Sequence, residues 1–183
     1  VGHINHNLRG EASDGDEAFV LEQADSLGIK ARSVRVDVRS HATAQKLSIE
    51  TAARELRHEA LTRLAQELRC TSIATAHQRD DNAETVVHRL LRGTGYRGLT
   101  GIWPKRRTAS GITLIRPLLP VSRNEIFEYL AQRGAKWRHD ASNDRLDHTR
   151  NLIRHRLLPE ISRGTGERLA GELSMLVAAS LRY

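Results

Sequence analysis

The chain has 183 residues, enough for one hydrophobic core or for a core with a small appendage. Its single cysteine, Cys70, excludes an internal disulfide and any cysteine-rich zinc or iron–sulfur site within the chain. No apolar run approaches the length of a membrane span and no basic-then-apolar leader opens the chain, so we expect a cytoplasmic protein without a membrane segment.

Positive charge is unevenly distributed along the chain. The net charge is +7, and residues 86–163 hold 16 Lys/Arg against 6 Asp/Glu, whereas the rest holds 13 against 16. Arginine supplies 25 of the 29 cations, which favours bidentate contacts with phosphate. We expect a polyanionic partner for the basic part, the alternative being ordinary solvated helix faces. Aromatic residues make up 4% of the chain, which argues against base stacking over a wide platform.

Hydrophobic periodicity and capping residues predict alternating strands and helices in the first half of the chain. The expected elements are a strand tail over residues 1–6, a helix from Ser13 and Asp14 to Gly28, a strand over 32–38, a loop, a helix capped by Ser48 that runs to Leu68, a strand over 71–76 and a helix over 81–92. This order predicts an α/β fold with a doubly wound, mainly parallel sheet. Cys70 precedes a strand, so we expect its thiol to be buried.

Glycine and proline become frequent after residue 92. The expected elements are a glycine-punctuated segment over 93–101, a hairpin-like turn at Ser110 and Gly111, a short strand over 113–116, a helix from Ser122 to Gly134, a helix over 147–161 and an amphipathic stretch over 169–181. Ser122 and Glu125 have the spacing of a capping box. The predicted organisation is a nucleotide-binding domain over residues 1–140, followed by a basic helical appendage over 141–183 that begins a further helical domain.

Acidic side chains gather where a predicted strand passes into a predicted helix, in the segment His77-Gln-Arg-Asp80-Asp81-Asn-Ala-Glu84. In open α/β sheets ligands bind at this carboxyl edge, and the helix N-terminus adds donors for phosphate. Asp81 and Glu84 also have capping-box spacing, so capping explains these two about as well as ligand binding does. Capping does not explain His77 or the adjacent Asp80, and we therefore favour a functional site.

Seven segments in succession resemble one enzyme family. They are His3-x-Asn5-His6-x-Leu8-Arg9-Gly10, Ala52-Ala53-Arg54-x-x-Arg57, His77-x-x-Asp80-Asp81-x-Ala83-Glu84-Thr85, Leu91-Arg92-Gly93-Thr94-Gly95-x-x-Gly98-Leu99-x-Gly101, Ile115-Arg116-Pro117-Leu118-Leu119, Asp140-x-Ser142-Asn143 and Arg150-Asn151-x-Ile153-Arg154-His155. Each is weak alone, but their order over residues 3–159 resembles the tRNA(Ile)-lysidine synthetases, members of the PP-loop ATP-pyrophosphatase group.

The resemblance implies a ligase that modifies the wobble cytidine in the anticodon stem-loop of a minor isoleucine tRNA. ATP with Mg²⁺ adenylates the C2 oxygen of the base and releases pyrophosphate. The amine of free L-lysine then attacks C2 and AMP leaves, which produces lysidine. Because the family commonly forms dimers, the resemblance also raises a homodimer as one arrangement.

The resemblance also assigns roles to particular residues. Catalytic candidates are Asp81, Glu84, Arg54 and Arg57; cofactor-binding candidates are His77, Asp80, Arg92, Gly93 and Gly95; substrate or tRNA contacts are His6, Arg9, Arg116, Arg150, Asn151 and Arg154. Asp81 is the first candidate for Mg²⁺, and either Asp81 or Glu84 could position the lysine amine and accept its proton.

Two arginine pairs have helical spacing and therefore admit a plainer interpretation. Arg54 and Arg57 can share one face of a helix, where pairing with Glu50 is the alternative to substrate binding. Arg150 and Arg154 share a face in the same way, and simple coverage of their helix is the equal alternative to phosphate or substrate contact.

The chain departs from the family at its start, because the Ser-Gly-Gly-x-Asp-Ser loop that grips pyrophosphate is absent. We expect an N-terminal βα unit to belong to the biological protein. Three other interpretations compete: a non-catalytic RNA-binding remnant, a PP-loop tRNA thiolase, and a plain nucleotide-binding module. The thiolase ranks lower because such enzymes use several cysteines and this chain has one.

Overall fold

The computed structural model describes residues 1–140 and 149–165. The chain divides into two compact units, Val1–Ile73 with Arg107–Thr113, and Ala74–Arg106 with Leu114–Tyr183. Each unit is described by itself. No helix in the described ranges is long and apolar enough to cross a membrane.

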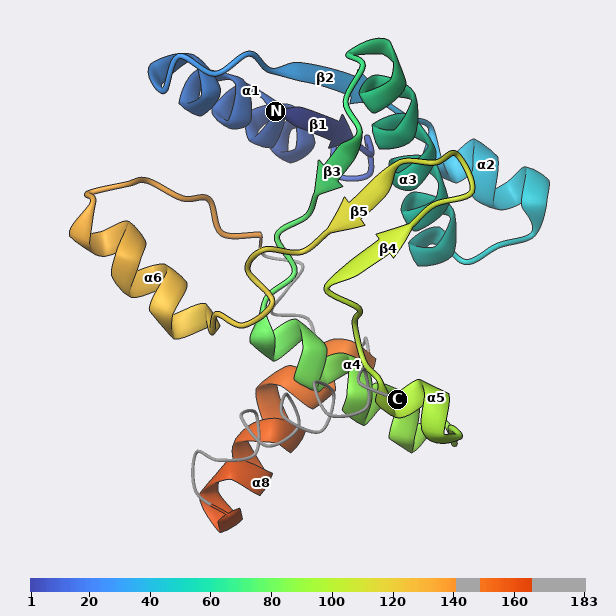
Figure 1. The fold of residues 1–183 in the computed structure, drawn as a ribbon, viewed down its shortest axis with the longest axis vertical. Coiled ribbons are helices and arrows are strands. Elements are labelled where there is room, and N and C mark those ends of the chain that lie inside the picture. The colour runs from blue at the N-terminus through green and yellow to red at the C-terminus, as the bar shows by residue number, and fades with distance from the viewer. Residues whose placement is uncertain (141–148, 166–183) are drawn as a thin grey trace. The chain divides into compact units, whose positions relative to one another are not determined.

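The first unit is built on a parallel strand pair. Its elements are β1 (Gly2–Asn5), α1 (Glu11–Ser26), β2 (Arg32–Arg35), α2 (Val38–Gln45) and α3 (Ile49–Glu67). β1 and β2 lie side by side and run parallel, in register from Gly2 opposite Arg32 to Asn5 opposite Arg35 (Figure 1). Both α1 and α3 pack against β1. A parallel pair joined through a helix is the βα arrangement that the sequence predicts.

Small apolar side chains of α2 and α3 form two cores in this unit. Ile4, Ala60 and Leu64 form one, against which Val34 and Val36 pack. The alternation of valines over residues 32–38 therefore places them against the core, as predicted. The second core joins Val38, Ala42 and Ala52, with Leu8, Leu47 and Leu56 packed around it.

Helix α2 begins at Val38, which the sequence predicts to lie in a strand, and continues through residues predicted to be a loop; both predictions are wrong. Asp37 caps this helix, because its Oδ1 accepts the Ser40 N–H at 3.0 Å and its Oδ2 accepts the Ser40 hydroxyl at 2.6 Å. Val38 and Ala42, four residues apart, are buried on one face of α2. The cap and this short apolar face stabilise two turns of helix in a segment otherwise rich in polar residues.

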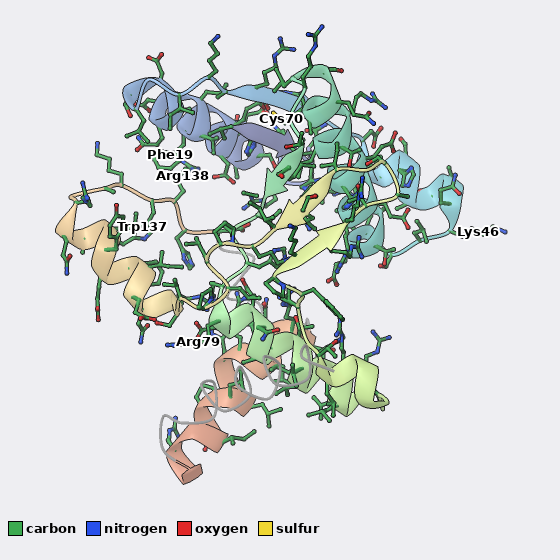
Figure 2. The ribbon with its side chains drawn as sticks, viewed as in Figure 1. Phe19, Lys46, Cys70, Arg79, Trp137 and Arg138 are labelled. Carbon is green, nitrogen blue, oxygen red and sulfur yellow. The ribbon has the colours of Figure 1, made fainter. Side chains whose placement is uncertain are left out.

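Two further expectations need correction. Helix α1 begins at Glu11 after Gly10, so Ser13 is not its cap; the Ser13 hydroxyl instead accepts the Arg9 N–H at 3.2 Å. Cys70 is exposed and not buried (Figure 2). It follows the left-handed residue Arg69 (φ 53°) in the turn that ends α3, outside the short strand that follows.

The second unit contains the remaining helices. Its elements are α4 (Arg79–Leu91), α5 (Tyr96–Leu99), α6 (Arg123–Gln132), α7 (Thr149–Leu152), the π-helical turn η2 (Ile153–Leu157) and α8 (Leu158–Thr165). The helix predicted over 147–161 is thus confirmed over its described part. The stretch over 169–181 lies outside the described residues, as does the domain boundary predicted after residue 140, which remains a prediction.

Three short strands, β3 (Ser72–Ala74), β4 (Lys105–Arg107) and β5 (Thr113–Ile115), form a sheet in the order β3-β5-β4. Thr113 N–H donates to Thr71 O, and Thr75 N–H donates to Ile115 O. The residue numbers of the hydrogen-bonded partners increase in the same direction along β3 and β5, as in a parallel pair. β4 and β5 are joined by the turn at Ser110 and Gly111 that the sequence predicts. After β3 the four residues 75–78 lead into α4, the strand-to-helix passage expected for the acidic segment.

Ser48 offers a direct test of the capping inferred from the sequence. Its Oγ accepts the Thr51 N–H at 3.2 Å at the start of α3, a helix with four buried residues. We expect Ser48→Ala to lower the free energy of unfolding by about 1 kcal/mol, because one N–H of the first turn loses its acceptor. Urea unfolding followed by circular dichroism measures this. Ser48→Asp, which keeps an acceptor, is the matched control, and equal losses in both variants would contradict the capping role.

Candidate functional site

The N-terminus of α4 carries a capping box one turn earlier than predicted. Gln78 is the capping residue: its Oε1 accepts the Asp80 N–H at 2.7 Å, and Asp81 Oδ2 accepts the Gln78 N–H at 3.1 Å. The pairing of Asp81 with Glu84 as a capping box is therefore wrong, because the helix begins at Arg79 and not at Asp81. The Asp81 side chain belongs to the capping box of its own helix, whereas Glu84 lies within the helix and takes no part in the cap.

The start of α4 is also tied to the start of α6. Asp80 Oδ2 accepts the Arg123 N–H at 2.8 Å, and Arg79 N–H donates to Val121 O at 2.8 Å. The Arg79 guanidinium pairs with Glu125 at 3.3 Å; Figure 2 shows Arg79 at the first turn of α4. Asp80 is therefore a structural acceptor for a neighbouring helix through one oxygen, and its predicted role in cofactor binding remains a prediction.

Glu84 is the centre of an arginine cluster, which we define as Glu84 with Arg123, Arg150 and Arg154. The Glu84 side chain is 1% exposed. Arg154 donates to it twice, from Nε to Oε1 at 2.6 Å and from Nη2 to Oε2 at 2.9 Å, and Arg150 Nε donates to Oε2 at 3.0 Å. Arg123 Nη2 lies 3.6 Å from Oε1. Bringing a carboxylate so far from water is costly unless cations and hydrogen bonds compensate, and here they do.

Asp81 adds a second carboxylate to the same arginines. Its Oδ1 lies 3.6 Å from Arg150 Nη2 and 3.5 Å from Arg154 Nη2. Burial disfavours the charged form of Arg154, but the hydrogen bond and charge of Glu84, then the charges of Asp81 and Asp80, outweigh it, and the pKa of Arg154 is raised. The Arg154 guanidinium is therefore permanently charged at the cluster.

The local sequence of α7 and η2 explains why two arginines reach one carboxylate. Arg150 and Arg154 are four residues apart and share a helix face, as predicted. Ile153, between these two arginines in the sequence, is fully buried, and α4 packs against both α7 and η2 (Figure 1). Asn151 is buried in α7. The π-helical turn begins at Ile153, where such turns often mark functional positions.

A cavity of about 210 Å³ opens beside the cluster. Its lining residues are Asp80, Ala83, Glu84, Arg123, Arg154, Leu158 and Pro159. Two carboxylates and two guanidinium groups thus face an apolar wall, an arrangement that suits a ligand with both charged and aliphatic parts. A larger hollow of about 340 Å³ in the first unit, between β2 and α3, is lined by none of the predicted site residues.

The predicted Mg²⁺ site at Asp81 does not fit the side chains around it. One Asp81 oxygen caps Gln78 and the other faces two guanidinium groups, while Glu84 is fully engaged by arginines. Magnesium requires several oxygen ligands in octahedral geometry. Among the described residues no group of three or more His, Cys, Asp or Glu side chains could hold a metal ion. We therefore assign no metal to Asp81.

Other predicted residues of the second unit lie outside the arginine cluster. His77 Nδ1 bonds the Thr75 hydroxyl at 2.9 Å, and the Arg116 guanidinium donates to the Trp103 carbonyl. Arg92 ends α4, Gly93 adopts a left-handed conformation with φ 73°, and Gly95 precedes α5. Arg92, Gly93 and Gly95 shape the turn between α4 and α5. The cofactor-binding roles predicted for them and for His77, and the substrate contact predicted for Arg116, remain predictions.

The glycine-punctuated segment is held to α4 by two side chains that sequence reasoning did not select. Asn82 Oδ1 accepts the Ile102 N–H at 2.6 Å, and Arg89 Nη1 donates to the carbonyls of Gly98 and Gly101, both at 3.0 Å. A Cβ at Gly98 would lie 1.6 Å from Thr94 Oγ1, so this position requires glycine. Arg123 was also missed, because nothing in its local sequence separates it from any arginine in the first turn of a helix.

The predicted residues of the first unit are His6, Arg9, Arg54 and Arg57. Arg9 pairs with Asp16 at 2.6 Å, and Arg54 and Arg57 are exposed on α3. His6 follows β1, with its Nδ1 buried and unpaired among the described residues. Burial, then the nearby charge of Arg57, then His3, lowers the pKa of His6 from its ordinary value of 6.5.

A polar cluster beside His6 was not predicted. Asn5, almost wholly buried at the end of β1, donates from Nδ2 to Glu17 Oε2 at 2.7 Å and to Asp14 Oδ1 at 3.2 Å. Arg35, which ends β2, pairs with Asp14 at 2.9 Å and Glu17 at 3.1 Å. The hydrogen bond from Asn5 is the largest cause of a lowered pKa at Glu17. Side chains at the carboxyl ends of two parallel strands thus meet, which strand register could have indicated.

Comparison with known proteins gives a consistent family assignment. The family model of the ATP-binding PP-loop domain matches residues 1–161. A protein of Chlorobaculum tepidum named tRNA(Ile)-lysidine synthase is 43% identical over 176 residues, covering 96% of this chain and 52% of that protein. One of the same name from Parabacteroides distasonis is 42% identical over 184 residues, covering 99% of this chain and 41% of that protein. The chain thus spans about half the length of the curated relatives it matches.

A solved structure shows the same fold. The U34-tRNA thiolase of Methanococcus maripaludis, determined with its 4Fe–4S cluster, superimposes with a TM-score of 0.74 over 100% of this chain and 61% of that chain, at 15% identity. The predicted α/β class and the predicted resemblance are both confirmed.

The lowered pKa of His6 makes a prediction about stability and pH. The unfolded chain takes up a proton at about 6.5, whereas the folded chain resists it, so between the two pKa values the unfolded state binds more protons. The contribution of His6 to stability is therefore largest above pH 6.5 and falls as the pH drops below that value. We expect His6→Gln to flatten this dependence and Arg57→Gln to weaken it. Urea unfolding across a pH series measures both, and an unchanged slope in His6→Gln would contradict the assignment.

Proposed function

The chain belongs to the PP-loop domain family, and on that premise we propose that its protein uses ATP to join L-lysine to the wobble cytidine of isoleucine tRNA. The C2 oxygen of the base attacks the α-phosphate of ATP, and pyrophosphate leaves. The lysine amine then attacks C2, loses a proton, and AMP departs with the oxygen. The products are lysidine, AMP and pyrophosphate, which makes the protein a carbon–nitrogen ligase.

One observation carries this proposal: 42–43% identity over 96–99% of the chain to two proteins named tRNA(Ile)-lysidine synthase. The motif order supports it, because the seven predicted segments follow one another in the family's order within residues 3–159. The proposed partner is the anticodon stem-loop of the tRNA and the proposed compartment is the cytoplasm. A homodimer is the oligomeric state proposed on the resemblance alone.

The arginine cluster supplies chemistry that this reaction needs. Transfer of an adenylyl group develops negative charge on phosphate oxygens, which guanidinium groups stabilise. Arg150 is 42% exposed and Arg123 33% exposed, so both can reach a substrate phosphate beside the cavity. Arg150 and Arg154 are accordingly proposed as phosphate or tRNA contacts.

Asp81 is proposed to act on the lysine substrate. Its Oδ1 makes only ion-pair contacts longer than 3.4 Å among the described residues, so that oxygen could accept an ammonium or a proton. Mg²⁺ enters the proposal as the counter-ion of ATP, and no step is assigned to a metal held by Asp81. The cofactor roles of His77, Asp80 and the glycines near residue 93 belong to the same proposal.

The proposal is tested by incubating the protein encoded by the whole reading frame with ATP, radiolabelled lysine and an isoleucine tRNA transcript. We expect label in the tRNA only when ATP is present, because the base must first be adenylated. A methionine tRNA transcript is the matched control. Absence of label, while a tRNA(Ile)-lysidine synthase incorporates lysine under the same conditions, would refute the proposal. Incorporation of radiolabelled sulfur in place of lysine would identify a thiolase.

Asp81→Asn separates a chemical role from a capping role. The asparagine carbonyl can still accept the Gln78 N–H that Asp81 accepts at 3.1 Å, so the helix start is preserved. We expect lysine incorporation to fall by about a hundredfold or more, since a general base and its charge are lost together. Binding of tRNA, measured by gel shift, should change little. Normal incorporation would leave Asp81 with capping alone.

A further inference from the structure

The position of Glu84 beneath three guanidinium groups has a consequence for how the substrate is held. We infer that Glu84 is a positioning residue: it fixes the guanidinium groups of Arg150 and Arg154 so that their outer N–H groups face phosphate, and it does not itself touch lysine, nucleotide or RNA. The inference rests on the proposed function and replaces the role of base or lysine ligand that the sequence left open for Glu84.

The acceptor capacity of Glu84 is already used within the protein. Each of its two oxygens accepts a charged N–H from Arg154, and Oε2 also accepts the Arg150 Nε–H at 3.0 Å. Arg123 Nη2 approaches the other oxygen at 3.6 Å. With its side chain 1% exposed and three charged N–H donors on its two oxygens, Glu84 has little surface left for an incoming amine, although it borders the cavity beside the cluster.

The arginines, in contrast, keep donors to spare. A guanidinium carries five N–H donors; Arg150 uses its Nε–H on Glu84, and Arg154 uses Nε and one side of Nη2. Nη2 of Arg150 and Nη2 of Arg154 also lie 3.6 and 3.5 Å from Asp81 Oδ1, so the donors left over are chiefly the Nη1 groups, on side chains that are 42% and 16% exposed. A carboxylate on the Nε side thus orients each fork with its outer edge available to an anion.

Glu84 is needed for this orientation because the side chains of Arg150 and Arg154 would not keep it by themselves. Arg150 and Arg154 carry like charges on one helix face, and each side chain loses about 2 kcal/mol of rotamer entropy when fixed. A carboxylate between them offsets the repulsion and fixes both before the substrate arrives. Glu84 lies 66 and 70 residues earlier in the chain than these arginines, on another helix, so it acts as an independent anchor.

The test is a kinetic comparison in the whole protein. The variants are Glu84→Gln, the pair Arg150→Gln with Arg154→Gln, and all three together, with Glu160→Gln as control because Glu160 forms an exposed ion pair with Arg163 at 2.8 Å. Loss of a supporting partner of this kind costs on the order of tenfold or more. We expect Glu84→Gln to raise the KM for tRNA by about tenfold while the KM for lysine stays unchanged.

The variant that carries all three substitutions decides whether Glu84 acts through the arginines. If it does, adding Glu84→Gln to the arginine pair changes the KM for tRNA by less than about twofold, because the groups it positions are gone. Multiplication of the separate effects, or a raised KM for lysine in Glu84→Gln, would overturn the inference. Glu84→Asp replaces Glu84→Gln should the latter not fold, and it should give an intermediate KM for tRNA with the same lysine KM.

The two proposals fail separately. Absence of lysine incorporation by the unmodified protein counts against the proposed function. In that event tRNA binding isotherms of the same variants still test positioning: coupling between Glu84 and the arginine pair supports it, and independent effects on the dissociation constant refute it.

Discussion

The second unit depends on one interaction, the contact between the buried Glu84 carboxylate and the guanidinium groups of Arg150 and Arg154. A carboxylate with 1% exposure is stable as an anion only if cations lie against it, so the position of Glu84 requires α7 and η2 to pack on α4. The interaction contributes little net stability, because desolvation offsets most of the Coulombic gain. Removing either side, however, leaves an unpaired buried charge at a cost of about 3–5 kcal/mol. The cluster therefore acts mainly by restricting which packing of the helices is allowed.

This constraint separates the three acids at the start of α4, which look alike in the sequence. Asp80 accepts a backbone N–H of α6, Asp81 caps its own helix and faces the arginines with its other oxygen, and Glu84 is buried under the arginines. Asp81 has one oxygen in its capping bond and another whose ion-pair partners are more than 3.4 Å away, while Asp80 has one oxygen on the Arg123 N–H and borders the cavity. The contacts therefore separate Glu84, which is enclosed by arginines, from Asp80 and Asp81, each of which keeps one oxygen outside its structural hydrogen bond.

Local features of the sequence predicted much of the fold. The caps Ser48 and Ser122 mark the starts of α3 and α6, and the spacing of Arg150 and Arg154 predicted a shared face. Errors arose where two local signals competed: Gln78 is an uncommon cap, so the box it forms with Asp81 was assigned one turn late, and the short apolar face of α2 was outweighed by its polar residues. The partners of Glu84 were beyond local reasoning, because 66–70 residues separate them and no periodicity relates positions so far apart.

The choice of arginine over lysine follows from this geometry. A lysine ammonium is a compact point charge, so a lysine at position 154 could neutralise Glu84 but would keep no second edge for a substrate. A guanidinium is planar, and its Nε side can hold a buried carboxylate while its Nη groups remain accessible. Arginine is thus the side chain that can connect the protein interior to a phosphate outside. Because 25 of the 29 cations are arginine, the chain has a composition suited to such bridging. The basic part of the chain, residues 86–163, contains the three arginines of the cluster.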